Sequence, residues 1–268
     1  MMKVVSRPIH LLLLCGVFLF PQVEATGQIA VRHTEGLVHG FLVLKTSEGE
    51  TLAHGDLSQT AHGVNVTSRL TFHFKDGSQR EETAVFSQRR YFQLLRYHLA
   101  EKGPVFEHPQ QLSIDVPAGK VEVRSIDGDG KQKVITENMK LPPDLANGLI
   151  FILLKNILSN GAATKASMIV ATPKPRLVKL AISAEGEDEF QVGTEKHKAT
   201  HYVVKIELGG ITGLVAPVIG KQPPDIHAWI LQGQAPAFVK SRGPLFANGP
   251  IWQIELESPV WPREAQPK

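Results

Sequence analysis

The stretch Val64–Phe74, with the sequence VNVTSRLTFHF, decides the fold. Its side chains alternate between two faces, with Val64, Val66, Ser68, Leu70, Phe72 and Phe74 on one and Asn65, Thr67, Arg69, Thr71 and His73 on the other. This period of two is typical of an antiparallel strand with one covered and one solvated face. The Asp76-Gly77 dipeptide that follows favours a tight hairpin with a positive φ angle at Gly77, so the chain should return along Gln79–Ser87.

Short apolar or alternating segments separated by Gly- and Pro-rich turns recur along the chain, which contains 23 Gly and 18 Pro. The further expected strands are Leu37–Lys45, Thr51–Gln59, Tyr91–Leu99, Leu112–Val116, Val121–Ile126, Lys133–Asn138, Lys165–Ala171, Leu177–Ser183, His201–Leu208, His227–Leu231, Ala237–Lys240 and Ile251–Leu256. Consecutive strands usually pair as antiparallel neighbours. The pattern therefore predicts a mainly β fold: a single large, antiparallel and strongly curved sheet, as an open barrel or half-barrel. A two-sheet β-sandwich is the alternative.

One segment, Asp144–Leu158, has a different pattern. Pro142 and Pro143 precede Asp144, which is a suitable N-cap, and Asn160-Gly161 provides a stop. Apolar side chains fall almost all the way round a helix here, so such a helix must be covered on more than one side. We expect one buried helix against the concave face of the sheet; a buried strand over Leu149–Leu154 is the competing interpretation.

The first 25 residues have the layout of a secretory signal peptide. Lys3 and Arg7 precede the apolar run Leu11–Phe20, and Ala25 is a suitable residue before the cleavage site. The sequence predicts export, to the periplasm or the medium, and a single β-rich domain over residues 26–268. The one cysteine, Cys15, lies in this segment, so no disulfide is expected. No second long apolar run follows, so the protein should not span a membrane.

The composition and motifs narrow the possible functions. The net charge of +3, with both signs interspersed, argues against nucleic-acid binding. The usual hydrolase, phosphate-loop and dinucleotide motifs are missing, so no catalytic residue or cofactor is predicted. His197 and His201 are four residues apart, which on a strand separates them by about 13 Å, too far for one zinc ion. Asp127–Gly130 is interpreted as a turn, so no metal site is predicted.

The C-terminal part resembles the closing strands of the periplasmic lipoprotein-carrier superfamily. The segments that carry this resemblance are Tyr202–Ile206, Gly209–Gly213, Gly220–Asp225, His227–Ile230 and Ala235–Lys240. The chain as a whole is similar to a family of exported bacterial proteins of unknown function, on the phrases Phe86–Gln88, Lys102–Pro104, Leu141–Gly148 and Gly220–Asp225.

The carrier resemblance implies that a curved sheet encloses a lipid or acyl chain. The expected function is therefore an envelope protein that binds or carries a hydrophobic ligand; a periplasmic hydrolase with an unidentified active site and a structural or adaptor protein are the alternatives. The candidate ligand-binding residues are Leu149, Phe151, Ile152, Leu153 and Ile157 on the helix, with Trp229 and Phe238 opposite them by the resemblance. Core packing and a tethered C-terminal strand explain Trp229, Trp252 and Trp261 without a function, and an aromatic wall of a ligand cavity is the alternative interpretation. The chain departs from carriers in offering one helix where they have several.

Overall fold

A computed structural model describes residues 27–126, 130–172, 174–192, 194–207 and 223–257. These residues form one short helix, α1 (Ile150–Leu154), and 14 strands. The strands are β1 (Val38–Lys45), β2 (Thr51–His62), β3 (Asn65–Phe74), β4 (Gln79–Gln88), β5 (Phe92–Lys102), β6 (Gln110–Asp115), β7 (Lys120–Ile126), β8 (Gln132–Asn138), β9 (Thr164–Thr172), β10 (Lys174–Val192), β11 (Glu195–Glu207), β12 (Ile226–Leu231), β13 (Ala237–Pro244) and β14 (Ile251–Leu256).

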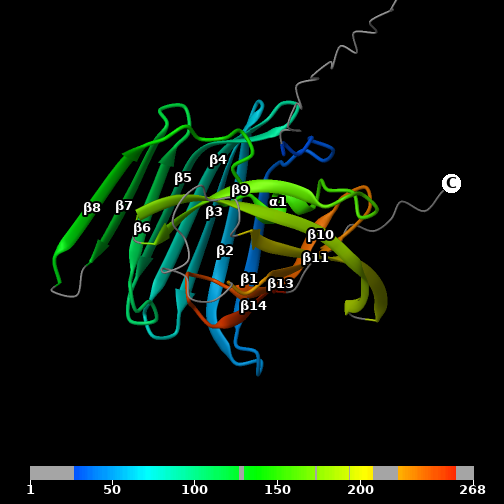
Figure 1. Cartoon of the computed structure of the whole chain (residues 1–268). Helices are drawn as coiled ribbons and strands as arrows, with labels where there is room; N and C mark the ends of the chain where they lie inside the picture. The colour runs from blue at the N-terminus through cyan, green and yellow to red at the C-terminus, as the bar shows by residue number, and fades with distance from the viewer. Residues whose placement is uncertain (1–26, 127–129, 173, 193, 208–222, 258–268) are drawn as a thin grey trace, which may run out of the picture.

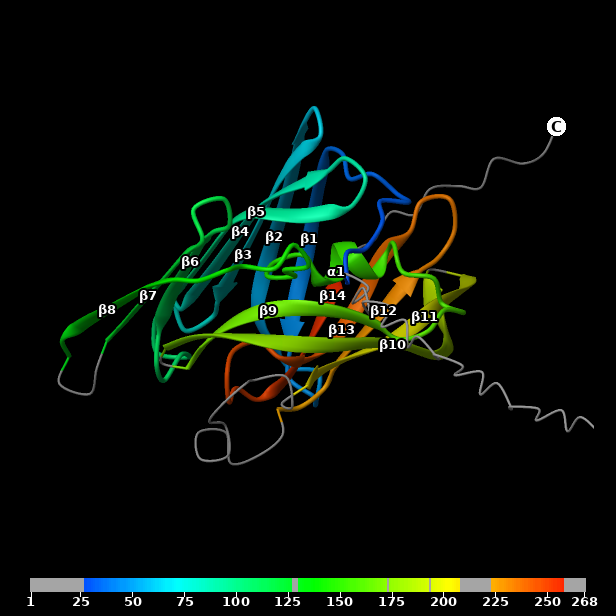
Figure 2. The same ribbon diagram turned by 45° about the horizontal axis from the view of Figure 1, so that its top comes forward.

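All strands belong to one antiparallel sheet. Its order is β8-β7-β6-β5-β4-β3-β2-β1-β14-β13-β12-β11-β10-β9, so β1 and β14 are neighbours while β8 and β9 form the two edges. The sheet curves around α1 without closing, because no pairing joins β8 to β9 within the described residues (Figures 1 and 2). The predicted open-barrel architecture is confirmed, and the β-sandwich alternative is wrong.

The expected hairpin between β3 and β4 is present. Gly77 has a φ angle of 85°, and its N–H donates to the Phe74 carbonyl at 3.1 Å. The Asp76 carboxylate accepts from the Ser78 N–H at 2.9 Å and stabilises the turn. Val64, which the alternation placed at the start of the strand, lies just before β3 and is 39% exposed.

The β10–β11 hairpin is longer than the sequence predicted. β10 has 19 residues and β11 has 13, and a bulge lies between Ala184 and Gly186. The acidic run around Glu187 and Glu189 has the composition of a loop. In the structure these carboxylates face Lys198 and Lys196 of β11, at 3.9 Å and 3.7 Å, so cross-strand charge pairs support a solvated strand there.

The helix is much shorter than the predicted Asp144–Leu158. The residues before α1 form backbone bonds to β9 instead: Ser167 N–H donates to the Asp144 carbonyl and Ala146 N–H to the Ser167 carbonyl. The Asn147 side chain also exchanges two 2.9 Å hydrogen bonds with the backbone of Ile169. Gly148 then takes a φ angle of 70°, and α1 begins with Leu149, not Asp144, at its N-cap position. This segment therefore covers the edge strand β9 before it turns into α1.

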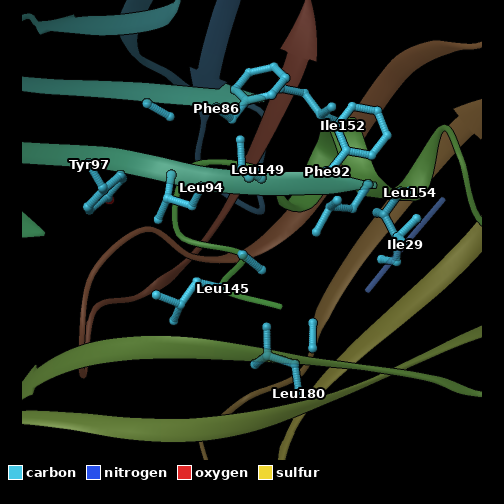
Figure 3. Close-up of a cluster of buried hydrophobic side chains, with 14 of the residues drawn as sticks. Ile29, Phe86, Phe92, Leu94, Tyr97, Leu145, Leu149, Ile152, Leu154 and Leu180 are labelled. Carbon is cyan, nitrogen blue, oxygen red and sulfur yellow. The ribbon is translucent and has the colours of Figure 1, made fainter. Parts of the chain in front are cut away.

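Two clusters of buried side chains fill the two ends of the curved sheet. The larger core joins α1 to the inner faces of β4–β7 and β9–β12. Figure 3 shows Phe86, Leu94 and Tyr97 on one side of the α1 segment and Leu180 on the other. A second group, the aromatic end cluster, consists of Phe74, Phe106, Phe246 and Trp252, with ring centroids 5.3–5.8 Å apart around the group.

Candidate functional site

Six of the seven predicted ligand-binding residues lie together inside the curved sheet. The side chains of Leu149, Ile152, Leu153 and Ile157 are at most 8% exposed and belong to the larger core. Phe151 and Phe238 are only half-buried, and their rings meet at 4.7 Å between centroids. One side of α1 and its flanking residues therefore packs into the core. Phe151 points instead toward Phe238 of β13, where the side chains are less buried.

Trp229 does not join this group, so the expectation that it stands opposite the helix is wrong. On β12 the core-facing residues are Ala228 and Ile230, and both are fully buried. Because successive strand residues point to opposite faces, Trp229 lies on the outer face of the sheet. Its indole N–H donates to the Asp188 carboxylate at 2.6 Å, on that same outer face.

Half-buried apolar side chains line part of the inside of the sheet between the two clusters. We call this group the inner apolar surface; its members are Leu57, Leu70, Phe151, Phe238, Ile254 and Leu256. Leu57 alternates along β2 with the buried Gly55 and Gln59, which places it on the inner face. Leu70 lies directly opposite it on β3, so the surface is continuous from strand to strand.

Gly40 leaves open space beside this surface. It shares the inner face of β1 with Leu42 and Leu44, and its register partner is Leu57. A Cβ atom built on Gly40 would meet no heavy atom of the described residues within 4 Å. By contrast, a Cβ on Gly55, two residues along β2 from Leu57, would come within 2.6 Å of the Phe72 ring. The inner face is therefore tightly packed at Gly55 and open at Gly40.

A buried cluster of charged side chains lies beside the inner apolar surface, on β4 and β5. Arg80 binds Glu101 at 2.8 Å and Glu82 at 3.3 Å, and the Tyr97 hydroxyl donates to Glu82 at 2.9 Å. Burial raises the pKa of Glu101 above its ordinary value, although the Arg80 guanidinium opposes the rise. Burial also raises the pKa of Tyr97 well above its ordinary value, so this hydroxyl stays a neutral donor. Glu82 lies directly opposite Leu70, which gives the apolar surface one polar boundary.

The N-terminal strap, residues 27–37, crosses the end of the sheet nearest to Gln59 and Gln88. The buried Glu35 carboxylate accepts from the Gln59 amide at 2.9 Å and pairs with Lys155 at 2.5 Å. The Glu35 backbone and the Gln88 side-chain amide exchange two more hydrogen bonds, at 2.7 Å and 2.8 Å. Asn156 accepts two further N–H groups of the strap, at 2.8 Å and 2.9 Å. The strap is thus joined to two strands and to the end of the α1 segment.

A second cluster of polar and aromatic side chains lies on the outer face, and it was not predicted from the sequence. His201 and His227 approach to 2.9 Å between ring nitrogens, and the His201 ring stacks on Trp229 at 4.5 Å. Burial and the neighbouring His227 hold the pKa of His201 below its ordinary value. Lys240 lies over the Trp229 ring at 4.4 Å. The pairing of β11 with β12 brings the two histidines together, and their spacing of 26 residues carries no local signal.

Two grooves meet at Trp229 on this outer face. One, of about 310 Å³, is lined by residues of all five strands from β10 to β14. The other, of about 510 Å³, is lined by His201, Pro224, Asp225, His227, Trp229, Arg242 and Ile251. The neighbouring strands already place His201 and Lys240 against the Trp229 ring. An aromatic ligand would therefore have to displace one of these side chains to stack there.

The described residues contain no group of three His, Cys, Asp or Glu side chains placed to hold a metal ion. His197 and His201 stay apart: His197 contacts Phe190 and Glu195, while His201 contacts His227. Within the same residues, no helix has the length and apolar character needed to cross a bilayer. Trp261, most of Asp127–Gly130 and the Met1–Ala25 segment lie outside the described residues.

Comparison with solved structures finds a structural neighbour of this chain. No protein-family profile and no curated protein sequence matches the chain. Among solved structures, the chain is similar to a β-barrel-like protein of a domain of unknown function (DUF1849) from Brucella abortus. The two share 7% sequence identity with a TM-score of 0.46, over 84% of this chain and 98% of the other. Its description states no activity.

Proposed function

We propose that the protein binds an elongated apolar molecule, of the lipid or acyl-chain class, against the inner apolar surface. The observation that carries this proposal is the combination of half-buried Leu57 and Leu70 with open space at Gly40. Leucine side chains on the concave side of a sheet gain free energy when an apolar partner covers them, at roughly 25 cal/mol per Å² of area buried. Ligand sites in proteins are commonly concave, apolar surfaces with a few polar groups.

The boundaries of this surface suit an extended ligand. The aromatic end cluster closes one end through Phe74 and Trp252, and the strap crosses the other through Glu35. Glu82 and the Tyr97 hydroxyl stand at the side of the surface and offer hydrogen-bonding groups to a polar head. An apolar chain lying along Leu57 and Leu70 would have its head beside Glu82, since Glu82 is the register partner of Leu70.

We also propose that the protein is exported and acts in a bacterial envelope. The support is the basic, apolar and small-residue order of Met1–Ala25, which is that of a signal peptide. A protein that shields apolar chains from water would be useful in an aqueous compartment between membranes, as the carrier resemblance implies.

Native mass spectrometry of protein purified without detergent tests the binding proposal. We expect a folded species heavier than the polypeptide by the mass of a lipid or fatty acid, and release of that mass on unfolding. A folded protein with the polypeptide mass alone, which also takes up no added fatty acid, would contradict the proposal.

A further inference from the structure

We propose that the end of the barrel crossed by the strap docks on the surface of an anionic bilayer. The surface in question, here the strap-end rim, comprises the apolar residues Leu37, Val64, Tyr91 and Leu158 and the basic residues Arg32, Arg89 and Arg90. The inference does not depend on ligand binding inside the barrel, although a carrier of lipids would make use of such a surface.

Of the seven large apolar side chains that are exposed among the described residues, four lie at this rim. Leu37 is 84% exposed and Leu158 54%, while Val64 and Tyr91 are 39% and 40% exposed. Isolated exposed apolar residues are common, but several at one end of a molecule indicate an interaction surface. Side chains of this kind enter the interface between headgroups and acyl chains when a protein lies on a membrane.

Backbone pairings and the Asn156 side chain bring the four segments of the rim together. Ala30 in the strap pairs with Tyr91, and the Val31 N–H donates to the Arg90 carbonyl. The Gln88 N–H donates to the Val64 carbonyl, which joins the β2–β3 and β4–β5 turns. Asn156, two residues before Leu158, holds the strap from the other side. Both turns and the strap lie at the same end of the sheet in Figures 1 and 2.

The charge of the rim is of one sign. Arg32, Arg89 and Arg90 are exposed. Segments 29–37, 62–65, 88–91 and 156–160 contain a single acidic residue, Glu35. Glu35 is only 7% exposed and is paired with Lys155, so it leaves the arginines uncompensated. Exposed guanidinium groups beside exposed leucines match a bilayer that offers phosphate headgroups and apolar chains together.

Vesicle co-sedimentation tests the inference, with the full chain and two vesicle compositions: phosphatidylcholine alone, and phosphatidylcholine with about one third phosphatidylglycerol. We expect tighter binding to the anionic vesicles. The double variant Arg89→Glu/Arg90→Glu should lose at least tenfold in affinity for them, because each substitution reverses a charge at the rim. Lys75→Glu/Lys102→Glu is the matched control. It makes the same change of net charge at the ends of β3 and β5 that lie away from the rim, so this variant should bind nearly as wild type.

Two double variants, a test and its matched control, examine the apolar part of the rim. Leu37→Asn/Leu158→Asn should weaken binding to anionic vesicles severalfold, while Ile126→Asn/Val134→Asn, which alters residues 55% and 50% exposed on β7 and β8, should not. All variants keep residues 1–26 unchanged, so any contribution of that stretch cancels in the comparison. Thermal unfolding monitored by circular dichroism establishes that each variant is folded.

Three results would overturn the inference: equal binding to both vesicle compositions, equal loss in the lysine control and the arginine variant, or full binding by the leucine variant. The last would mean that the exposed leucines do not enter the bilayer and that the apolar part of the rim takes no part in docking. Uptake of a fatty acid is measured separately on the same variants, so failure of bilayer docking and failure of ligand binding are distinguishable.

Discussion

Gly40 of β1 lies directly opposite Leu57 of β2 on the inner face of the sheet, and open space surrounds the glycine on that side. Elsewhere on this face, buried side chains meet from both sides, as at Gly55 beside Phe72. A barrel built only for stability would be expected to fill such a position, because protein interiors are close-packed. The gap at Gly40 is therefore the feature around which we place the ligand.

The β3–β4 turn should depend on the backbone conformation of Gly77. Its φ angle of 85° lies in a region that β-branched residues strongly disfavour. We expect Gly77→Val to lower the free energy of unfolding by about 1 kcal/mol or more, measured by urea denaturation. Gly77→Asn, which tolerates this region better, should lose less. Equal stability of the valine variant and wild type would refute the assignment.

Ile152 in the middle of α1 and Leu158, four residues after its end, should respond differently to a charge. Ile152 is 7% exposed in the larger core, so Ile152→Asp places an unpaired carboxylate among apolar side chains and should prevent folding. Leu158 is 54% exposed, and Leu158→Asp should change stability by less than about 0.5 kcal/mol. Circular dichroism and urea denaturation measure both effects. A folded, stable Ile152→Asp protein would show that the core at this position is not packed.

Removal of the Glu35 side chain should loosen the strap. Glu35→Ala removes the acceptor for the Gln59 amide and leaves Lys155 without its partner, which we expect to cost about 1–3 kcal/mol. Hydrogen exchange of the amides in residues 29–37 should become faster. The exposed neighbour offers a control, Thr34→Ala, that should exchange as wild type. Unchanged protection in Glu35→Ala would mean that Asn156 holds the strap without help from Glu35.

The His201–His227 pair should make stability dependent on pH. The pKa of His201 is lower in the folded protein than its ordinary value of about 6.5, so the unfolded chain binds the proton more tightly. This histidine therefore favours the unfolded state as the pH falls below about 6.5 towards its folded pKa. In an NMR titration, His227→Gln should move the pKa of His201 back towards 6.5, although burial keeps it below that value. A wild-type His201 that titrates above 6.5 would contradict the geometry.

Most of the fold could be predicted because its signals are local. The alternation in Val64–Phe74 and the Asp76-Gly77 turn each depend on neighbours in the sequence, and the structure contains both. The helix boundaries could not be predicted in this way. Asn147 is bound to the backbone of Ile169, a residue 22 positions away, and this contact determines where the segment stops following β9.

The candidate site was predictable only in part, for a similar reason. Residues 226–231 read IHAWIL, and both faces of this strand carry large apolar side chains. Hydropathy alone did not decide between Trp229 and Ile230 as the inward residue, and the carrier resemblance suggested Trp229. Gly40 was overlooked because a glycine in a strand carries no apolar signal, and the space beside it exists only once β1 and β2 are paired.

Binding of the neutral fluorescent probe N-phenyl-1-naphthylamine to wild type and Gly40→Leu tests the central claim most directly. The added leucine would occupy the open space beside Leu57, so we predict at least tenfold weaker probe binding in a variant that remains folded. Thr60→Leu, which places the same leucine side chain at an exposed position on the outer face of β2, should bind the probe as wild type. A folded Gly40→Leu protein with undiminished probe binding, or a wild type that binds no probe, would contradict the claim that this barrel holds an apolar ligand.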